Sequence, residues 1–149
     1  MIEWSDIKWF TPDEFADPDF SGSGELIDMI LALNLDYLRG MAGVPIKIQN
    51  KVGGAVDMEG RHGHSDNSYH LFKNGCKAAD FYFTELDFIT PCKSILPRAQ
   101  YKLVERQGFG GIGVYYDWGI PVGFHVDLRP LEKFQRWTRR NGEYFYLLS

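Results

Sequence analysis

The chain has 149 residues, of which 44% are hydrophobic, 15% aromatic and 24% charged, and its formal net charge is −4. This length is typical of one domain, and the high aromatic content excludes a chain that is mainly disordered. The acidic balance argues against nucleic acid as a partner, and the longest apolar stretch is far shorter than the ~20 residues that a membrane span needs.

The first half of the chain is expected to hold the helices. The segment Thr11-Pro12-Asp13-Glu14 combines a capping residue, a proline and two acids, which predicts a short helix that Asp17-Pro18 ends. Between residues 25 and 41, apolar side chains recur about every 3.6 residues, which predicts a long amphipathic helix. Alternation over residues 45–49 then indicates a strand.

The second half is expected to supply most of the sheet. Strands are predicted at residues 78–83, 109–116 and 123–128, and the last two form an antiparallel hairpin because a short turn joins them. A further helix is expected within residues 91–107, with a kink or a split at Pro97. Together these elements predict an α+β fold, a small and mostly antiparallel sheet with the N-terminal helices packed on it.

A tail at residues 131–149 follows the last of these strands. We expect its aromatic side chains to pack into the core, and the alternative is a platform that binds sugars: Trp137, Tyr144, Phe145 and Tyr146. No repeat or linker divides the chain, which predicts a single domain over residues 1–149. Two cysteines without a CxxC motif exclude a disulfide scaffold, and the absence of a signal peptide predicts a protein that is cytoplasmic at synthesis.

Histidine and aspartate side chains suggest where chemistry could occur. His70 ends a polar loop, Asp80 lies in a predicted strand, and His125 and Asp127 share one face of another strand because side chains alternate with period two. Two histidines and one aspartate are a ligand set that zinc accepts, with a fourth position open. Other interpretations remain for these residues: unrelated surface groups at His70 and Asp80, or an ordinary sheet histidine at His125. His62 and His64 could be the metal pair or a second site, but on a glycine-rich loop we expect them to be exposed to solvent or to have a substrate-side role.

Four segments in order carry a resemblance to a known family: Ser68-Tyr69-His70, Cys76-Lys77-Ala78-Ala79-Asp80, Gly110-Gly111-Ile112-Gly113-Val114-Tyr115-Tyr116 and Phe124-His125-Val126-Asp127. With the segments upstream, they resemble the zinc D-Ala-D-Ala carboxypeptidase and endolysin family of peptidases over residues 10–130. The resemblance implies one Zn²⁺ ion on the sheet face, held by His70, Asp80 and His125. It also implies hydrolysis of a peptide bond in bacterial peptidoglycan stem peptides, by a D-Ala-D-Ala carboxypeptidase or an L-Ala-D-Glu endopeptidase.

The chain departs from the family pattern at three places. More residues separate His70 from Asp80 than in the family, and the extra ones lie at positions 71–75. Lys51 stands near the position of the family's substrate-binding arginine, so we expect it to contact the substrate carboxylate. Val122 stands where many members carry an acidic base. We therefore expect Asp127 to be catalytic, with Asp117 as the other candidate base and the orientation of a ligand histidine as an alternative role for Asp127.

Two hypotheses about function follow. The first is a monomeric zinc metallopeptidase that binds peptidoglycan peptides and neither nucleic acid nor membrane, such as a phage lysin that reaches the cell wall by a phage route. The second is a non-catalytic structural or wall-binding module on the same fold, such as a phage particle component. The His, Asp, His set favours the first hypothesis, and the missing acid at Val122 favours the second.

Overall fold

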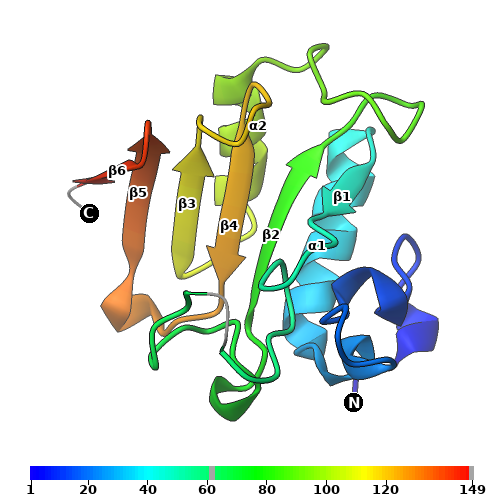
Figure 1. Ribbon diagram of the computed structural model, residues 1–149. Helices are drawn as coiled ribbons and strands as arrows, with labels where there is room; N and C mark the ends of the chain where they lie inside the picture. The colour runs from blue at the N-terminus through cyan, green and yellow to red at the C-terminus, as the bar shows by residue number, and fades with distance from the viewer. Residues whose placement is uncertain (61–62, 148–149) are drawn as a thin grey trace.

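The computed structural model describes residues 1–60 and 63–147 of the chain. Its centre is a six-stranded mixed sheet in the order β1-β2-β4-β3-β5-β6 (Figure 1). The strands of this sheet are β1 (Ile46–Ile48), β2 (Ala78–Phe83), β3 (Gly111–Tyr115), β4 (Gly123–Asp127), β5 (Gln135–Arg140) and β6 (Glu143–Leu147). The predicted α+β class is therefore confirmed, and the four strands expected between residues 45 and 128 are all present.

The sheet is mixed because β5 joins it in parallel. β3 and β4 form the predicted antiparallel hairpin, whereas β5 pairs in parallel with β3 and in antiparallel with β6. After β4 the chain crosses over β3, and β5 pairs with the edge of β3 that β4 does not occupy. The expectation of a mostly antiparallel sheet did not include this crossover, because periodicity locates strands but not their order in a sheet.

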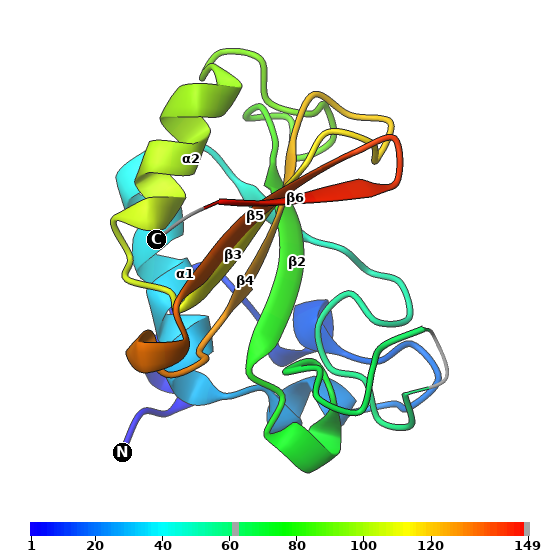
Figure 2. The same cartoon turned by 90° about the vertical axis from the view of Figure 1, so that its left-hand side faces the viewer.

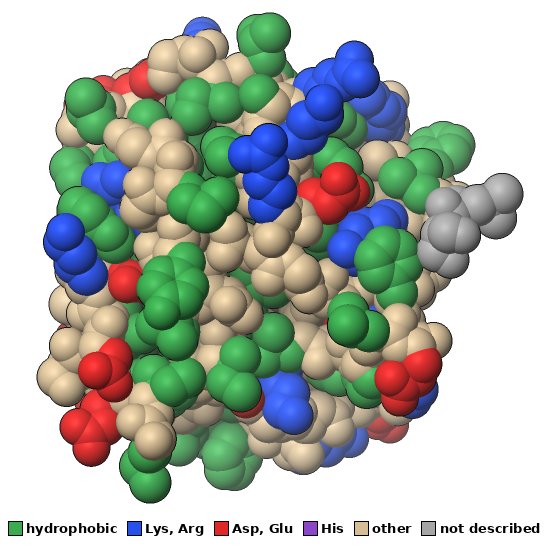
Figure 3. Space-filling model, turned by 180° about the vertical axis from the view of Figure 1, so that it is seen from behind, with side chains coloured by type: hydrophobic (Ala, Val, Ile, Leu, Met, Phe, Trp, Pro, Cys, Tyr) green, Lys and Arg blue, Asp and Glu red, His purple; other side chains and the backbone are tan. Residues whose placement is uncertain are grey.

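One face of the sheet is covered by the helices α1 (Met29–Ala42) and α2 (Pro97–Glu105), as Figure 2 shows. Alternate residues of the central strands point into this layer and form the core with α1: Phe81, Phe83, Ile112, Val114, Phe124, Val126, Leu31, Leu35 and Leu38. Seen from behind, the helix-covered side shows no histidine among the described residues (Figure 3). None of the helices in the described residues has the length and apolarity needed to cross a bilayer.

α1 begins later than the sequence indicated, whereas α2 lies within its expected range and begins at Pro97 instead of being kinked or split there. Residues Ser23–Leu26 form a 3-10 turn, and α1 starts at Met29 because the Asp28 side chain accepts hydrogen bonds from the backbone N–H of Ile30 (2.8 Å) and Leu31 (3.2 Å). α2 starts at Pro97, since proline is favourable at the first helical position and keeps Leu96 extended. α1 packs on the sheet as expected of an N-terminal helix.

The N-terminal segments η1 (Trp4–Asp6) and η2 (Pro12–Phe15) are short 3-10 turns, and η2 takes the place of the short helix expected from Thr11 to Asp17. The chain at the end of η2 forms hydrogen bonds with a later loop. The backbone N–H of Val56 donates to the Phe15 carbonyl (3.1 Å), and the N–H of Met58 donates to the buried Asp17 carboxylate (3.1 Å). These bonds fix residues 53–60, which lie beside the candidate site.

The aromatic tail forms the hairpin of β5 and β6. Trp137 is buried as expected, but Tyr144, Phe145 and Tyr146 are 49%, 49% and 62% exposed. The prediction that these three side chains belong to the core is therefore wrong. β6 is the edge strand of the sheet, so no further layer covers its side chains.

Candidate metal centre

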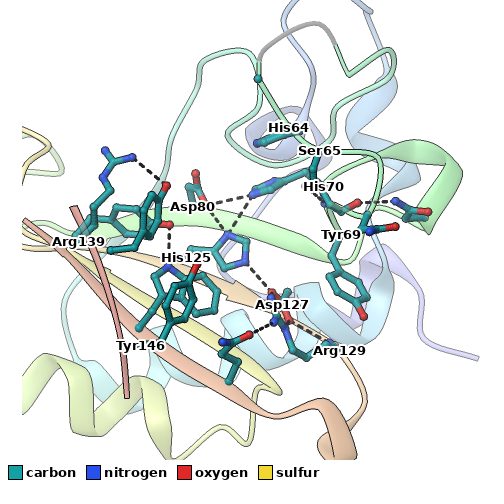
Figure 4. A pocket seen from close by; sticks show the side chains of 18 of the residues that line it. His64, Ser65, Tyr69, His70, Asp80, His125, Asp127, Arg129, Arg139 and Tyr146 are labelled. Atoms are coloured by element: carbon teal, nitrogen blue, oxygen red, sulfur yellow. Dashed lines mark hydrogen bonds and ion pairs between the residues drawn. The ribbon is translucent and has the colours of Figure 1, made fainter. Parts of the chain in front are cut away.

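Three side chains converge on the sheet face opposite the helices. His70 Nε2 lies 3.2 Å from His125 Nδ1 and 3.2 Å from Asp80 Oδ1, and the last two atoms are 2.9 Å apart (Figure 4). Four ligands at ~2.0–2.1 Å around a tetrahedral zinc ion lie about 3.3–3.4 Å from one another. The triangle is close to that size, so His70, Asp80 and His125 could hold a metal ion.

Each histidine has one ring nitrogen held by a hydrogen bond and turns the other toward the triangle. His70 Nδ1 donates to the carbonyl of Ala55 (2.9 Å), and Nε2 faces Asp80 and His125. His125 Nε2 donates to Asp127 Oδ2 (2.8 Å), whereas Nδ1 lies 2.9 Å from Asp80 Oδ1 and can bind a metal ion once it has lost its proton. Contacts of this kind orient ligand histidines and raise their basicity. The donor set therefore fits a divalent metal ion.

Charge at the centre is balanced within the cluster. Burial by itself would raise the pKa of Asp80, but His70 and His125 hold it well below its usual range. Burial would likewise lower the pKa of His125, but its hydrogen bonds to Asp127 and Asp80 raise it to about 9. Asp80 is therefore an anion at neutral pH, the form in which a carboxylate binds metal.

The local sequence explains how these residues meet. β2 and β4 pair so that Asp80 lies directly opposite His125. The extra residues before Asp80 form the short turn η4 (Phe72–Asn74), in which Phe72 is 49% exposed, and Gly75 closes it with a positive φ of 96°. Residues 71–75 thus turn outward, and His70, at the start of this turn, reaches the triangle.

Asp127 lies behind His125 and not at the open side of the triangle. Its two oxygens receive four hydrogen bonds: from His125 Nε2 and, from Arg129, the backbone N–H, Nε and Nη2. The carboxylate is fully buried. Although burial would raise its pKa, Arg129 and His125 hold that pKa far below the usual range. This geometry matches the alternative in which Asp127 orients a ligand histidine.

Asp117 is held away from the centre by a structural contact. It accepts from Arg139 Nε (3.0 Å) and from the backbone N–H of Gly142 (2.8 Å), and it is not among the residues that line the cavity over the triangle. The Gly142 hydrogen bond is the main cause that lowers its pKa. Asp117 thus anchors the β5–β6 turn, and its contact with the cavity is through Arg139 and not through the triangle.

A cavity of about 1070 Å³ lies over the triangle, and Lys51, expected from the sequence to contact substrate, is one of the residues that line it. Arg129, Lys133 and Arg139 line it too. Asp127 pairs with Arg129, Arg139 pairs with Asp117, and Asp80 contacts both histidines, so Lys51 and Lys133 are the lining cations without an ion-pair partner among the described residues. The cavity is therefore more cationic than the acidic chain as a whole, which favours anionic ligands.

A second histidine packs directly on the triangle. The His64 ring stacks on His70 with centroids 4.4 Å apart, and its Nδ1 donates to Oδ2 of the fully buried Asp57 (2.8 Å). Burial, and next His70, lower the pKa of His64, so the ring is neutral near pH 7. Its Nε2 has no hydrogen-bond partner among residues 1–60 and 63–147. His62, considered beside it from the sequence, lies outside the described residues.

Sequence reasoning did not find Asp57, Arg129 or Arg139, and it named Trp137 as an aromatic side chain of the tail without placing it beside His125. Asp57 lies seven residues before His64 in the chain, and no sequence motif marks it as a partner of that histidine. Trp137 and Arg139 could have been found from the two-residue period of a strand, had the tail been assigned as one. Comparisons of the chain with protein-family models, curated proteins and solved structures found no match.

Proposed function

We propose that this chain is a zinc-dependent peptidase that hydrolyses a peptide bond in peptidoglycan stem peptides, with His70, Asp80 and His125 as the zinc ligands. The observation that carries this proposal is the triangle of ligand atoms, 2.9–3.2 Å apart, at the floor of a large cavity. Two imidazoles and one carboxylate suit zinc, and three protein ligands leave a fourth position for substrate or water. The resemblance of the sequence to zinc peptidases supplies the substrate class.

When bound, zinc supplies Lewis-acid chemistry, which polarises a carbonyl and activates water. Around it, Asp127 acts as a positioning residue that fixes the His125 tautomer. His64 is the proposed proton acceptor in place of Asp127, because Asp57 holds its Nδ1–H and leaves Nε2 as an unprotonated base beside His70. This assignment also explains how the reaction could proceed with Val122 where the family has an acid.

Substrate charge is matched by the cations of one cavity wall. Lys51 Nζ lies 5.7 Å from the centre of the Trp118 ring, and the Arg139 guanidinium lies 4.8 Å from that of Tyr115, which stacks on Trp118. Stem peptides carry free carboxylates. We propose that Lys51 and Arg139 bind such a carboxylate, with the aromatic rings between them limiting their movement.

The test is release of new amino groups from purified peptidoglycan by the zinc-loaded protein, with mass spectrometry of the products to identify the bond. His125→Ala should abolish release, and His64→Gln should lower it ~10²-fold or more while zinc remains bound. Phe145→Ala, on the outer face of β6, is the matched control and should leave the rate unchanged. Zinc binding without any release would refute the peptidase proposal.

The buried Val122 favours one second candidate, a module that binds the cell wall through this cavity without cutting it. In that case, zinc content and wall binding would both be found, and no bond would be cleaved. The same experiment therefore separates the two candidates.

A further inference from the structure

The C-terminal hairpin places two exposed tyrosines inside the cavity. Tyr144 and Tyr146 alternate along β6, so both point to the side that carries His125, and both line the cavity. Their rings are nearly parallel, with an angle of 16° between planes and centroids 6.3 Å apart. Figure 4 draws Tyr146 among the side chains that line the cavity. We call these two rings the tyrosine shelf.

The tyrosine shelf continues the row that holds the metal ligands. Strand pairing aligns Asp80 with His125, His125 with Gly113, Gly113 with Trp137, and Trp137 with Tyr146. Gly113 leaves room for the Trp137 indole, whose centroid lies 5.3 Å from the His125 ring. The Trp137 ring lies between the two groups, and its centroid is 6.5 Å from that of Tyr146, so the Tyr146 ring lies at most about 12 Å from the His125 ring. A ligand on the shelf is thus well away from a bond held at the triangle.

The chemistry of the shelf fits a saccharide. Two nearly parallel and exposed tyrosine rings offer apolar faces of the kind that stack on the C–H face of a sugar ring. Polar groups rim these faces: Arg139 Nη1 contacts the Tyr144 hydroxyl (3.3 Å), and Gln135 and Lys133 also line the cavity. Such donors match the hydroxyl and acetamido groups around a sugar ring. A purely apolar partner would instead suit the other face of β6, which carries Phe145 and Leu147.

We infer that Tyr144 and Tyr146 bind the amino-sugar rings of a glycan strand, so that the preferred substrate is a stem peptide still attached to its glycan. The inference rests on the proposed function for the identity of the peptide, but the sugar contact itself needs no metal. Extended chain covers about 3.3–3.6 Å per residue, so a span of about 12 Å is covered by three or four residues, or by fewer residues and a linked sugar.

The experiment measures binding of the tetrasaccharide of N-acetylglucosamine to the metal-free protein by NMR titration. We expect saturable shifts at the shelf, and about tenfold weaker binding for Tyr146→Ala and Tyr144→Ala. Tyr146→Phe keeps the ring and should bind within about threefold of the parent. Phe145→Ala is the matched control, since Phe145 lies on the same strand and is exposed to the same 49% as Tyr144 but faces away from the cavity. Its affinity should be unchanged.

Several results would overturn the inference. These are no binding of the tetrasaccharide, equal binding by Tyr146→Ala and the parent, or displacement of the sugar by a free stem peptide, which would make the shelf a peptide site. Thermal melting of each variant controls for folding. Sugar binding without cleavage of peptidoglycan would support the shelf while refuting the peptidase, and cleavage without sugar binding would do the reverse.

Discussion

Replacing Asp127 with asparagine tests whether this carboxylate orients His125 or acts as the catalytic base. The two Asp127 oxygens accept four donors, two on each oxygen. Asparagine keeps one oxygen, so two of these donors would face an NH₂ group. If that group faces His125, the ring must move its proton to Nδ1, the atom that completes the triangle.

Loss of such an orienting contact weakens metal binding about 10- to 100-fold, which corresponds to about 1.4–2.7 kcal/mol. Arg129 also loses its counter-charge. Breaking a buried ion pair costs about 3–5 kcal/mol. The Arg129 side chain is 18% exposed, so we expect the metal-free variant to lose about 2–3 kcal/mol of stability.

The assays are competition for zinc with a chromophoric chelator and denaturant unfolding of the metal-free protein. Asp117→Asn is the matched control, because Asp117 also pairs with an arginine but has no contact with the triangle. Its zinc affinity should equal that of the parent. If Asp127→Asn binds zinc within about twofold of the parent while turnover falls ~10²-fold, Asp127 is the base and the orienting role is refuted.

Three further predictions concern stability. Burial raises the pKa of Cys76 to about 11 from 9.0, so between these pH values the folded state keeps a proton that the unfolded state loses. The free energy of unfolding should therefore fall by up to about 2.7 kcal/mol as pH rises from 9 to 11. Urea unfolding of Cys76→Ala should lack this part of the pH dependence. Gly113→Val should cost about 1–3 kcal/mol and change tryptophan fluorescence, because a Cβ there would meet Trp137 Nε1 at 2.5 Å; an unchanged melting curve would contradict this. Zinc at 100 times its Kd should stabilise the parent by about 2.7 kcal/mol in the same unfolding assay and leave His125→Ala unaffected.

The strands that carry Asp80 and His125 could be predicted from the sequence, because the fold buries most of the apolar residues in these segments. β2 occupies the predicted residues, and β4 differs from the prediction by one residue at its end. Side chains alternate along both strands, so the placement of His125 and Asp127 on one face also follows from local periodicity. The candidate ligand set could therefore be named from the sequence.

The tail and the partners of the ligands could not be predicted in the same way. Strand β5 reads Gln-Arg-Trp-Thr-Arg-Arg, in which Trp137 is the one apolar residue, so no alternating pattern indicates a strand. Its place beside β3 depends on a crossover, and the exposure of Tyr146 depends on that place. The contact between Asp57 and His64 likewise depends on how one loop folds. Tertiary contacts of this kind leave no periodic signal.

The most direct test of the central claim is the zinc content and coordination of the purified protein, by elemental analysis and X-ray absorption. The account predicts one zinc ion per chain, bound by two imidazole nitrogens and a carboxylate oxygen at ~2.0–2.2 Å. It also predicts loss of this zinc in His70→Ala and in His125→Ala, and its retention in His64→Gln. A protein that binds no zinc, or one that keeps its zinc after His125→Ala and loses it after His64→Gln, would contradict the account.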